Sequence, residues 1–210
     1  MADQEKEHFC LLMAFLFSPP DEEMVKQAHL GGVHSFFQRY VQSWEGGSGF
    51  LKGFLMEGDL GILLKDLGNE YDRLFSRLNN DSIPPVESVY KPWTQDPLCS
   101  LPFASERGLL MGDSAINLLE IYRHTGLDVA AEFNGCPDHI VLELEFLSHL
   151  YRGTTDKEVK KFIEDHLDWI SLFKEELTKL HPHPFYKSLL EILDLFLTTE
   201  RKRLERTGNG

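Results

Sequence analysis

Apolar residues recur at intervals of three and four positions along most of this chain. This spacing places side chains on one face of an α-helix. Runs of alternating β-branched residues bounded by turns, which indicate strands, are almost absent. The sequence therefore predicts an all-α fold. The clearest apolar stripe lies between about residues 59 and 78 and consists of Leu60, Leu63, Leu64, Leu67, Tyr71, Leu74, Phe75 and Leu78.

Helix breakers divide this periodic pattern into segments. The prolines of Ser18-Pro19-Pro20 end a first helix of about residues 4–17, because proline disfavours helical geometry in the residue before it. Thr155 begins a capping-box sequence, Thr-Asp-Lys-Glu, which marks the start of another helix. A length of 210 residues fits one domain, 1–210, with a sizeable core. Further helices are expected after Asp21 and over about 33–44, 59–78, 105–126, 137–152, 155–180 and 185–206.

The segment 79–104 holds five of the ten prolines, which deny it regular helix. We expect a long ordered loop there, which could also serve as a hinge. Such loops are uncommon in compact domains and are often functional. Glu87, Tyr90 and Trp93 follow one another along it, and an acid beside aromatic rings can hold a guanidinium by ion pairing and stacking. The alternative is a loop that only covers the core with Tyr90 and Trp93.

The net charge is −13, from 34 acidic and 21 basic residues. Nucleic acid and anionic membrane surfaces are unsuitable partners, because binding to phosphates requires a basic face. A basic peptide is a suitable partner, since an acidic surface attracts and orients cations. The alternative is that the charge only keeps the protein in solution.

The compartment follows from the cysteines and the N-terminal segment. Cys10, Cys99 and Cys136 lie far apart, which is typical of a reducing environment. The longest apolar run, Phe9 to Phe17, is too short to cross a bilayer. The acidic segment before it does not resemble a signal peptide. The sequence therefore predicts a cytoplasmic protein.

The densest polar cluster on an apolar helix lies between Asp138 and His149. Acid and imidazole groups on one helix can bind a metal ion or transfer protons. The spacings of di-iron bundles and zinc proteases, Glu-x-x-His and His-Glu-x-x-His, are nevertheless missing. A structural alternative is that Asp138 and His139 cap the helix and join it to its neighbour. The rival enzymatic hypothesis is a helical metal-carboxylate enzyme that would use His139, Glu143, Glu145, His149 and His166.

Asp165, His166 and Trp169 repeat the acid–imidazole pairing in a later helix. No Gly-x-Ser-x-Gly motif or other recognisable nucleophile accompanies them. We therefore expect no catalytic centre and no cofactor, and the chain is interpreted as a binding protein. A purely structural scaffold is the remaining alternative.

Five short segments are spread over most of the chain. They are Glu70-Tyr71-Asp72-Arg73-Leu74-Phe75, Pro84-Pro85-x-Glu87-Ser88-Val89-Tyr90, Pro137-Asp138-His139-x-x-x-Glu143-Leu144-Glu145-Phe146-Leu147, His166-Leu167-x-Trp169-x-x-x-Phe173 and His183-Pro184-Phe185-Tyr186. In this order, they resemble the TorD/DmsD/NarJ family of redox-enzyme maturation chaperones, and the third segment is the most specific.

The resemblance implies an all-α cytoplasmic protein without enzymatic turnover. Members of this family bind the twin-arginine leader or a core region of a molybdopterin oxidoreductase subunit until its cofactor is inserted, and so delay its export. The resemblance also implies a monomer or a domain-swapped dimer. The leader-binding residues that it implies are Tyr90, Trp93, Asp138, His139, Glu143 and Glu145, with Asp165, His166 and Trp169 in addition.

Overall fold

The computed structural model describes residues 1–42, 44, 47–76 and 82–207. This part of the chain folds into ten α-helices and two 3₁₀ helices, which confirms the predicted all-α class. The elements are α1 (Asp3–Leu16), α2 (Glu22–His29), α3 (Gly32–Val41), η1 (Gly47–Phe54), α4 (Leu60–Phe75), α5 (Glu87–Tyr90), α6 (Asp113–His124), η2 (Ala131–Phe133), α7 (Ile140–Gly153), α8 (Asp156–His166), α9 (Ile170–Lys179) and α10 (Pro184–Thr207).

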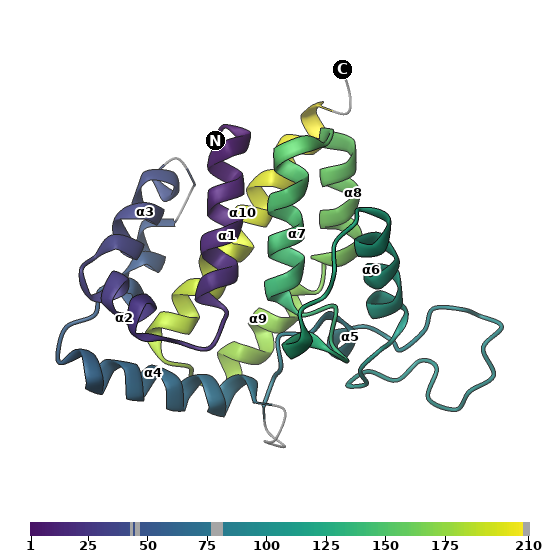
Figure 1. Ribbon diagram of the computed structural model, residues 1–210, viewed down its shortest axis with the longest axis horizontal. Helices are drawn as coiled ribbons and strands as arrows, with labels where there is room; N and C mark the ends of the chain where they lie inside the picture. Colours follow the sequence, from purple (N-terminus) through teal and green to yellow (C-terminus); the bar gives the residue numbers. More distant parts are fainter. Residues whose placement is uncertain (43, 45–46, 77–81, 208–210) are drawn as a thin grey trace.

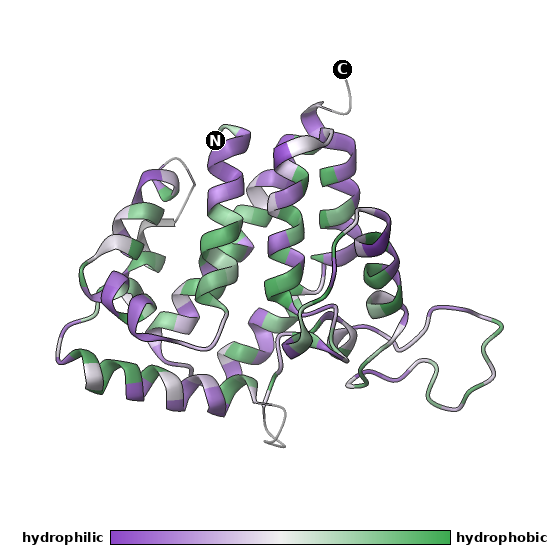
Figure 2. Cartoon of the chain, viewed as in Figure 1, coloured by the Kyte–Doolittle hydropathy of each residue, from purple (hydrophilic) through white to green (hydrophobic). Residues whose placement is uncertain are grey.

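The core of the bundle lies where α1, α7 and α10 pack together (Figure 1). α1 is polar near its N-terminus and apolar along the rest of its length, where it packs against α7 (Figure 2). Phe9 of α1 stacks on Phe196 of α10, with ring centroids 4.3 Å apart, and both rings are fully buried. Burying one such side chain contributes about 1.5–3 kcal/mol. α4 crosses one end of the bundle, while α6 and α8 lie beside α7.

Several helix boundaries agree with the prediction from sequence. Asp21 caps α2 and Asp59 caps α4, in each case through backbone N–H groups of the first turn. The predicted capping box at Thr155 is also present, since its hydroxyl and the Glu158 side chain reach each other's backbone N–H groups. No helix in the described ranges combines the length and apolar composition that a bilayer crossing requires.

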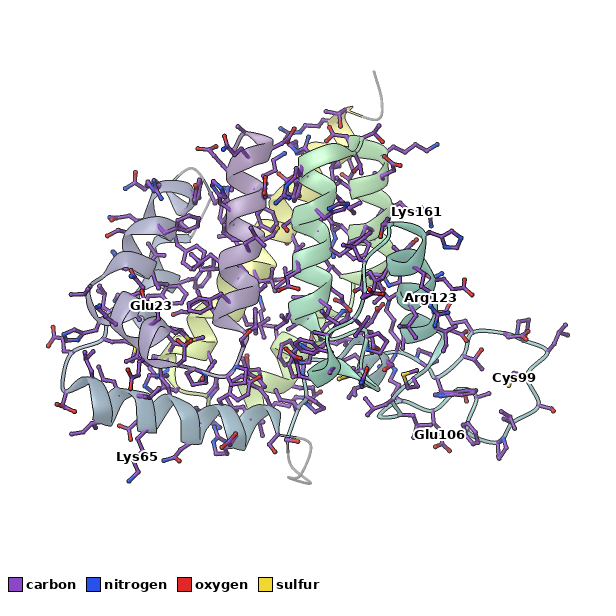
Figure 3. The ribbon with its side chains drawn as sticks, in the orientation of Figure 1. Glu23, Lys65, Cys99, Glu106, Arg123 and Lys161 are labelled. Carbon is purple, nitrogen blue, oxygen red and sulfur yellow. The ribbon has the colours of Figure 1, made fainter. Side chains whose placement is uncertain are left out.

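The connection between α5 and α6 is longer than predicted. It leaves the body of the molecule, and Cys99 lies on its outer part (Figures 1 and 3). The helix predicted from residue 105 begins only at Asp113, so this prediction was wrong. Gly108 has a left-handed φ of +85°, which a right-handed helix does not allow. A Cβ atom at Gly112 would lie 2.6 Å from the Trp93 carbonyl oxygen, so this glycine serves a close approach of two chain segments.

The predicted loop 79–104 also contains the one-turn helix α5, and its residues 79–81 lie outside the described part of the chain. Its hinge role stays a prediction.

Two more predicted boundaries were wrong. The helix predicted from Pro137 starts at Ile140, after a turn that contains Asp138. The helix predicted over 155–180 is interrupted after His166 and resumes at Ile170. At this junction the Trp169 indole N–H donates to the His166 carbonyl oxygen at 2.9 Å, which satisfies a carbonyl at the end of α8. The apolar period continues across the break, so periodicity alone does not reveal it.

Candidate functional site

Three carboxylate side chains meet where α5, α7 and the junction between α8 and α9 come together. Glu87, Asp138 and Glu143 are all fully buried. They belong to the set of residues that the sequence predicted to bind a peptide. We call these three residues the buried carboxylate cluster.

Glu87 is the first residue of α5 and has a partner on each oxygen. Its Oε2 lies 3.0 Å from His166 Nδ1, and its Oε1 lies 2.6 Å from Lys91 Nζ. The other ring nitrogen of His166, Nε2, contacts Asn117 Oδ1 on α6 at 2.9 Å. Glu87 therefore connects α5 to α8, and His166 extends this connection to α6.

Asp138 joins the proline-rich segment to the start of α7. Its Oδ2 accepts a 2.7 Å hydrogen bond from the backbone N–H of Ser88, in the single turn of α5. Its carbonyl oxygen accepts from the Glu87 N–H at 2.9 Å. Burial raises the pKa of the Asp138 carboxyl, against the lowering effect of the Ser88 hydrogen bonds. His139 next to it is the N-cap of α7, where its Nδ1 accepts from the Val141 N–H.

Glu143 lies one turn into α7 and faces the interior. Its Oε2 accepts a 3.1 Å hydrogen bond from the Trp169 indole N–H. The Trp169 ring stacks on the Tyr90 ring, with centroids 5.1 Å apart. Burial raises the pKa of Glu143 well above its usual range, and the neighbouring Glu87 and Asp138 charges add to this effect. This packing fixes α5, α7 and α9 relative to one another.

The remaining predicted residues lie apart from this cluster. Trp93 is half-buried in the long connection and packs edge-on against Phe103. Glu145 is exposed on the other face of α7, where it lines a separate pocket of about 240 Å³ together with His149. Burial and the charge of Glu132 raise the pKa of Glu145.

The residues of the rival metal-enzyme hypothesis are likewise divided. Glu143 faces the core, whereas Glu145 and His149 lie on the outer face of the same helix. Within the described ranges, no three His, Cys, Asp or Glu side chains are grouped as a metal ion would require. The geometry therefore gives this hypothesis no site.

An open groove of about 620 Å³ lies between α6 and the junction of α8 with α9. Among the described residues that line it, Lys91 is the one Lys or Arg. Asp165 and His166, which the sequence predicted to bind a peptide, line this groove. The sequence did not reveal its other lining residues, because they belong to segments distant in the chain. We call it the acidic groove, after its carboxylates Asp113, Glu120, Glu164, Asp165 and Asp168.

The carboxylates of the acidic groove differ in how far they are already neutralised. Asp113 accepts hydrogen bonds from the Thr94 hydroxyl and from the backbone N–H of Gln95. Glu164 pairs loosely with Lys160, at 3.7 Å. Glu120 has no ion-pair partner within the described part of the chain and is exposed. On the α6 wall, Glu120 is thus free to bind a cation, whereas on the α8 wall Glu164 and Asp165 pair with the exposed side chains of Lys160 and Lys161.

Comparison with known proteins places this arrangement in a family. Residues 60–188 match the family model described as nitrate reductase delta subunit. The chain belongs to this family. The matched range contains all five segments on which the resemblance to the TorD/DmsD/NarJ proteins rests, so that resemblance is confirmed.

Individual relatives are distant but consistent. The chaperone protein TorD of Shewanella piezotolerans is 27% identical over 131 residues, which are 61% of this chain and 58% of that protein. The chaperone protein TorD of Vibrio cholerae is 24% identical over 152 residues, which are 67% of this chain and 63% of that protein. These matches therefore span less than two thirds of the length of the relatives.

A solved structure from Archaeoglobus fulgidus, provisionally described as a redox enzyme maturation protein, has the same fold. It superposes with a TM-score of 0.52 at 24% identity, over 95% of this chain and 93% of that one.

Proposed function

We propose that this protein is a cytoplasmic chaperone that binds the twin-arginine leader of a molybdopterin oxidoreductase subunit in the acidic groove. Binding would hold the subunit until its cofactor is inserted and would delay its export. The observation that carries this proposal is the open groove with carboxylates on two facing helices. Family membership and the TorD relatives support the class of client.

The chemistry of the groove suits arginine. A guanidinium is planar and can pair with a carboxylate through two parallel hydrogen bonds, whereas an ammonium acts as a point charge. Glu120 on α6 and Glu164 on α8 offer acceptors from opposite sides. The net charge of −13 adds a long-range attraction that speeds the approach of a basic peptide.

The buried carboxylate cluster has a different part in this proposal. Asp138 and Glu143 are inaccessible to a peptide in the folded protein, and Glu87 is covered by Lys91 and His166. They hold α5, α7 and the junction of α8 with α9 in position and so shape the groove. Trp93 and Glu145 remain at the surface, where contact with a leader is feasible.

Calorimetric titration with a leader peptide that carries two adjacent arginines tests the proposal. The double variant Glu120→Gln with Glu164→Gln keeps the shape of both side chains and removes two charges. We expect its affinity to fall at least about tenfold, because hydrogen bonds to charged groups contribute about 1.5–3 kcal/mol each. A peptide with two lysines should bind the native protein more weakly than the arginine peptide.

The control is Glu22→Gln with Glu23→Gln, which changes the net charge equally at exposed positions of α2. Glu23 lies on the opposite side of the bundle from Arg123 of α6 and Lys161 of α8 (Figure 3). This variant should retain most of the affinity. Equal binding of the arginine and lysine peptides, both abolished by moderate salt, would mean that only diffuse electrostatics acts and that the groove is no binding site.

A further inference from the structure

Lys91 places a cation at the inner end of the acidic groove. Its Nζ lies 2.6 Å from Glu87 Oε1, 2.5 Å from Asp168 Oδ1 and 2.7 Å from the carbonyl oxygen of Asp165. The first oxygen belongs to the buried carboxylate cluster, the second to the junction of α8 with α9, and the third to the last turn of α8. Three oxygens of different origin thus converge on one ammonium group.

We propose that these three oxygens form a cation subsite, which Lys91 occupies in the free protein and which an arginine of the bound peptide takes over. The takeover by a peptide arginine rests on the proposed function. The subsite itself rests on the seated ammonium, which identifies the class of ligand as a primary ammonium or a guanidinium.

The environment of Lys91 allows such an exchange. Glu87 is fully buried, and leaving a buried charge without a partner is strongly unfavourable. Replacing one cation by another keeps Glu87 paired throughout. Lys91 lines the open groove, its side chain retains 14% exposure, and its backbone has left the helix after α5. The flexible side chain can therefore swing into water without moving a helix.

The exchange also gives a physical reason for preferring arginine to lysine. An incoming ammonium would only reproduce the contacts that Lys91 already makes, so the exchange would bring no net gain. A guanidinium has five N–H donors in a planar fork and can bond to more than one of the three oxygens at once. Lys91 thus sets the preference for arginine over lysine, because only a cation that binds the three oxygens more tightly than an ammonium can displace it.

Chemical rescue tests the subsite without any peptide. Lys91→Ala removes the ammonium and should lower the midpoint of thermal unfolding. Added n-propylammonium or methylguanidinium should restore part of the loss by filling the subsite. Tetramethylammonium at the same ionic strength should not, since it has no N–H donor. If neither n-propylammonium nor methylguanidinium raises the unfolding midpoint of Lys91→Ala, the subsite does not exist.

Peptide titrations test the takeover. In Lys91→Ala the vacant subsite accepts either cation. The affinity for the di-arginine peptide should therefore rise about tenfold, and that for the di-lysine peptide should rise more. The matched control is Lys160→Ala, which removes one cation beside the groove. It should raise both affinities by the same modest factor and show no rescue. An unchanged affinity of Lys91→Ala for the di-arginine peptide would overturn the takeover.

Lys91→Arg keeps the subsite filled and serves if the alanine variant does not fold. Its resident guanidinium competes on equal terms with an incoming arginine, so the di-arginine affinity should fall at least about tenfold. Native affinity in this variant would overturn the takeover. Rescue of Lys91→Ala without any di-arginine binding to the native protein would support the subsite and overturn the proposed function. Binding of the di-arginine peptide to the native protein, without rescue of Lys91→Ala, would support the proposed function and overturn the subsite.

Discussion

The buried carboxylate cluster and the acidic groove contain the same kind of side chain in adjacent parts of the molecule. Glu87, Asp138 and Glu143 have lost contact with water, whereas Glu120 and Glu164 keep it. A buried charge must be paired or neutralised within the protein, while an exposed one is free to bind something else. Burial, and not residue type, therefore separates a carboxylate that stabilises the fold from one that can bind a ligand.

The two regions meet at Lys91 and His166. Lys91 pairs with buried Glu87 and with exposed Asp168, and His166 contacts Glu87 on one side and Asn117 on the other. Burial opposes the charge of Lys91, but its pairing with Glu87 and Asp168 outweighs burial and raises the pKa. A change in the cluster is therefore expected to reach the groove, whereas a change at the outer groove should leave the cluster intact.

The largest effect is expected for Glu87→Ala. It leaves Lys91 and His166 without their shared buried partner, and breaking a buried ion pair in this way costs about 3–5 kcal/mol. Urea unfolding measures the loss. Glu120→Ala, on the exposed wall of the groove, is the control and should stay within about 0.5 kcal/mol of the native protein. Equal stability of the two variants would remove the distinction between the regions.

Asp138→Ala should have a smaller effect, of about 2 kcal/mol, because it leaves the Ser88 N–H in the interior without an acceptor. Asp138→Asn retains an acceptor oxygen and should lose less. The same unfolding measurement applies, combined with peptide titration of the folded protein. If the alanine variant is fully stable but no longer binds the leader, then Asp138 contacts the peptide directly and our assignment of its role is wrong.

Glu143→Gln should change the pH dependence of stability. The folded protein holds the Glu143 pKa well above the unfolded value, so it binds the proton more tightly than the unfolded chain does. The contribution of Glu143 to stability is thus complete below the unfolded pKa, about 4.3, and is lost as pH rises through the folded pKa.

Glutamine can still accept from Trp169 and does not ionise. Relative to the native protein, the variant should gain stability as the pH rises above the unfolded pKa, until the pH exceeds the raised pKa of Glu143 in the folded protein. Chemical unfolding at a series of pH values measures this difference. A difference that stays constant with pH would show that Glu143 ionises normally.

The smallest change in stability is expected for Glu120→Gln, within about 0.5 kcal/mol, together with weaker binding of the di-arginine peptide. Glu145→Gln changes the charge equally on the outer face of α7 and tests whether the leader binds there instead. If Glu145→Gln weakens binding and Glu120→Gln does not, the leader lies along the outer face of α7. The groove would then have to be abandoned as its site.

Local signals in the sequence predicted much of the fold. Asp21, Asp59 and the capping box at Thr155 mark true helix starts, because a cap is satisfied within one turn of the chain. The starts expected at residues 105 and 137 were wrong, because distant residues decide them. Gly112 has to fit against Trp93, and Asp138 binds the N–H of Ser88.

The candidate site was predicted in part. The sequence singled out Glu87 as an acid beside aromatic rings in the proline-rich segment, and Asp138 and Glu143 as members of a polar cluster on an apolar helix. It could not indicate that Glu87, Asp138 and Glu143 lie inside, nor that Glu120 and Glu164 face the same groove. Exposed acids are common in a chain with 34 of them, and nothing in their spacing distinguishes these two.

By itself, the sequence determined the helical class, the acidic charge and the family, because periodicity, composition and short motifs are properties of the chain. Only the tertiary structure decided which carboxylates are withdrawn from water and which remain open to a cation. The physical reason is that burial depends on which helices pack against each other. In this protein, α5, α7 and the junction of α8 with α9 close over one set of acids, while α6 and α8 leave another set exposed.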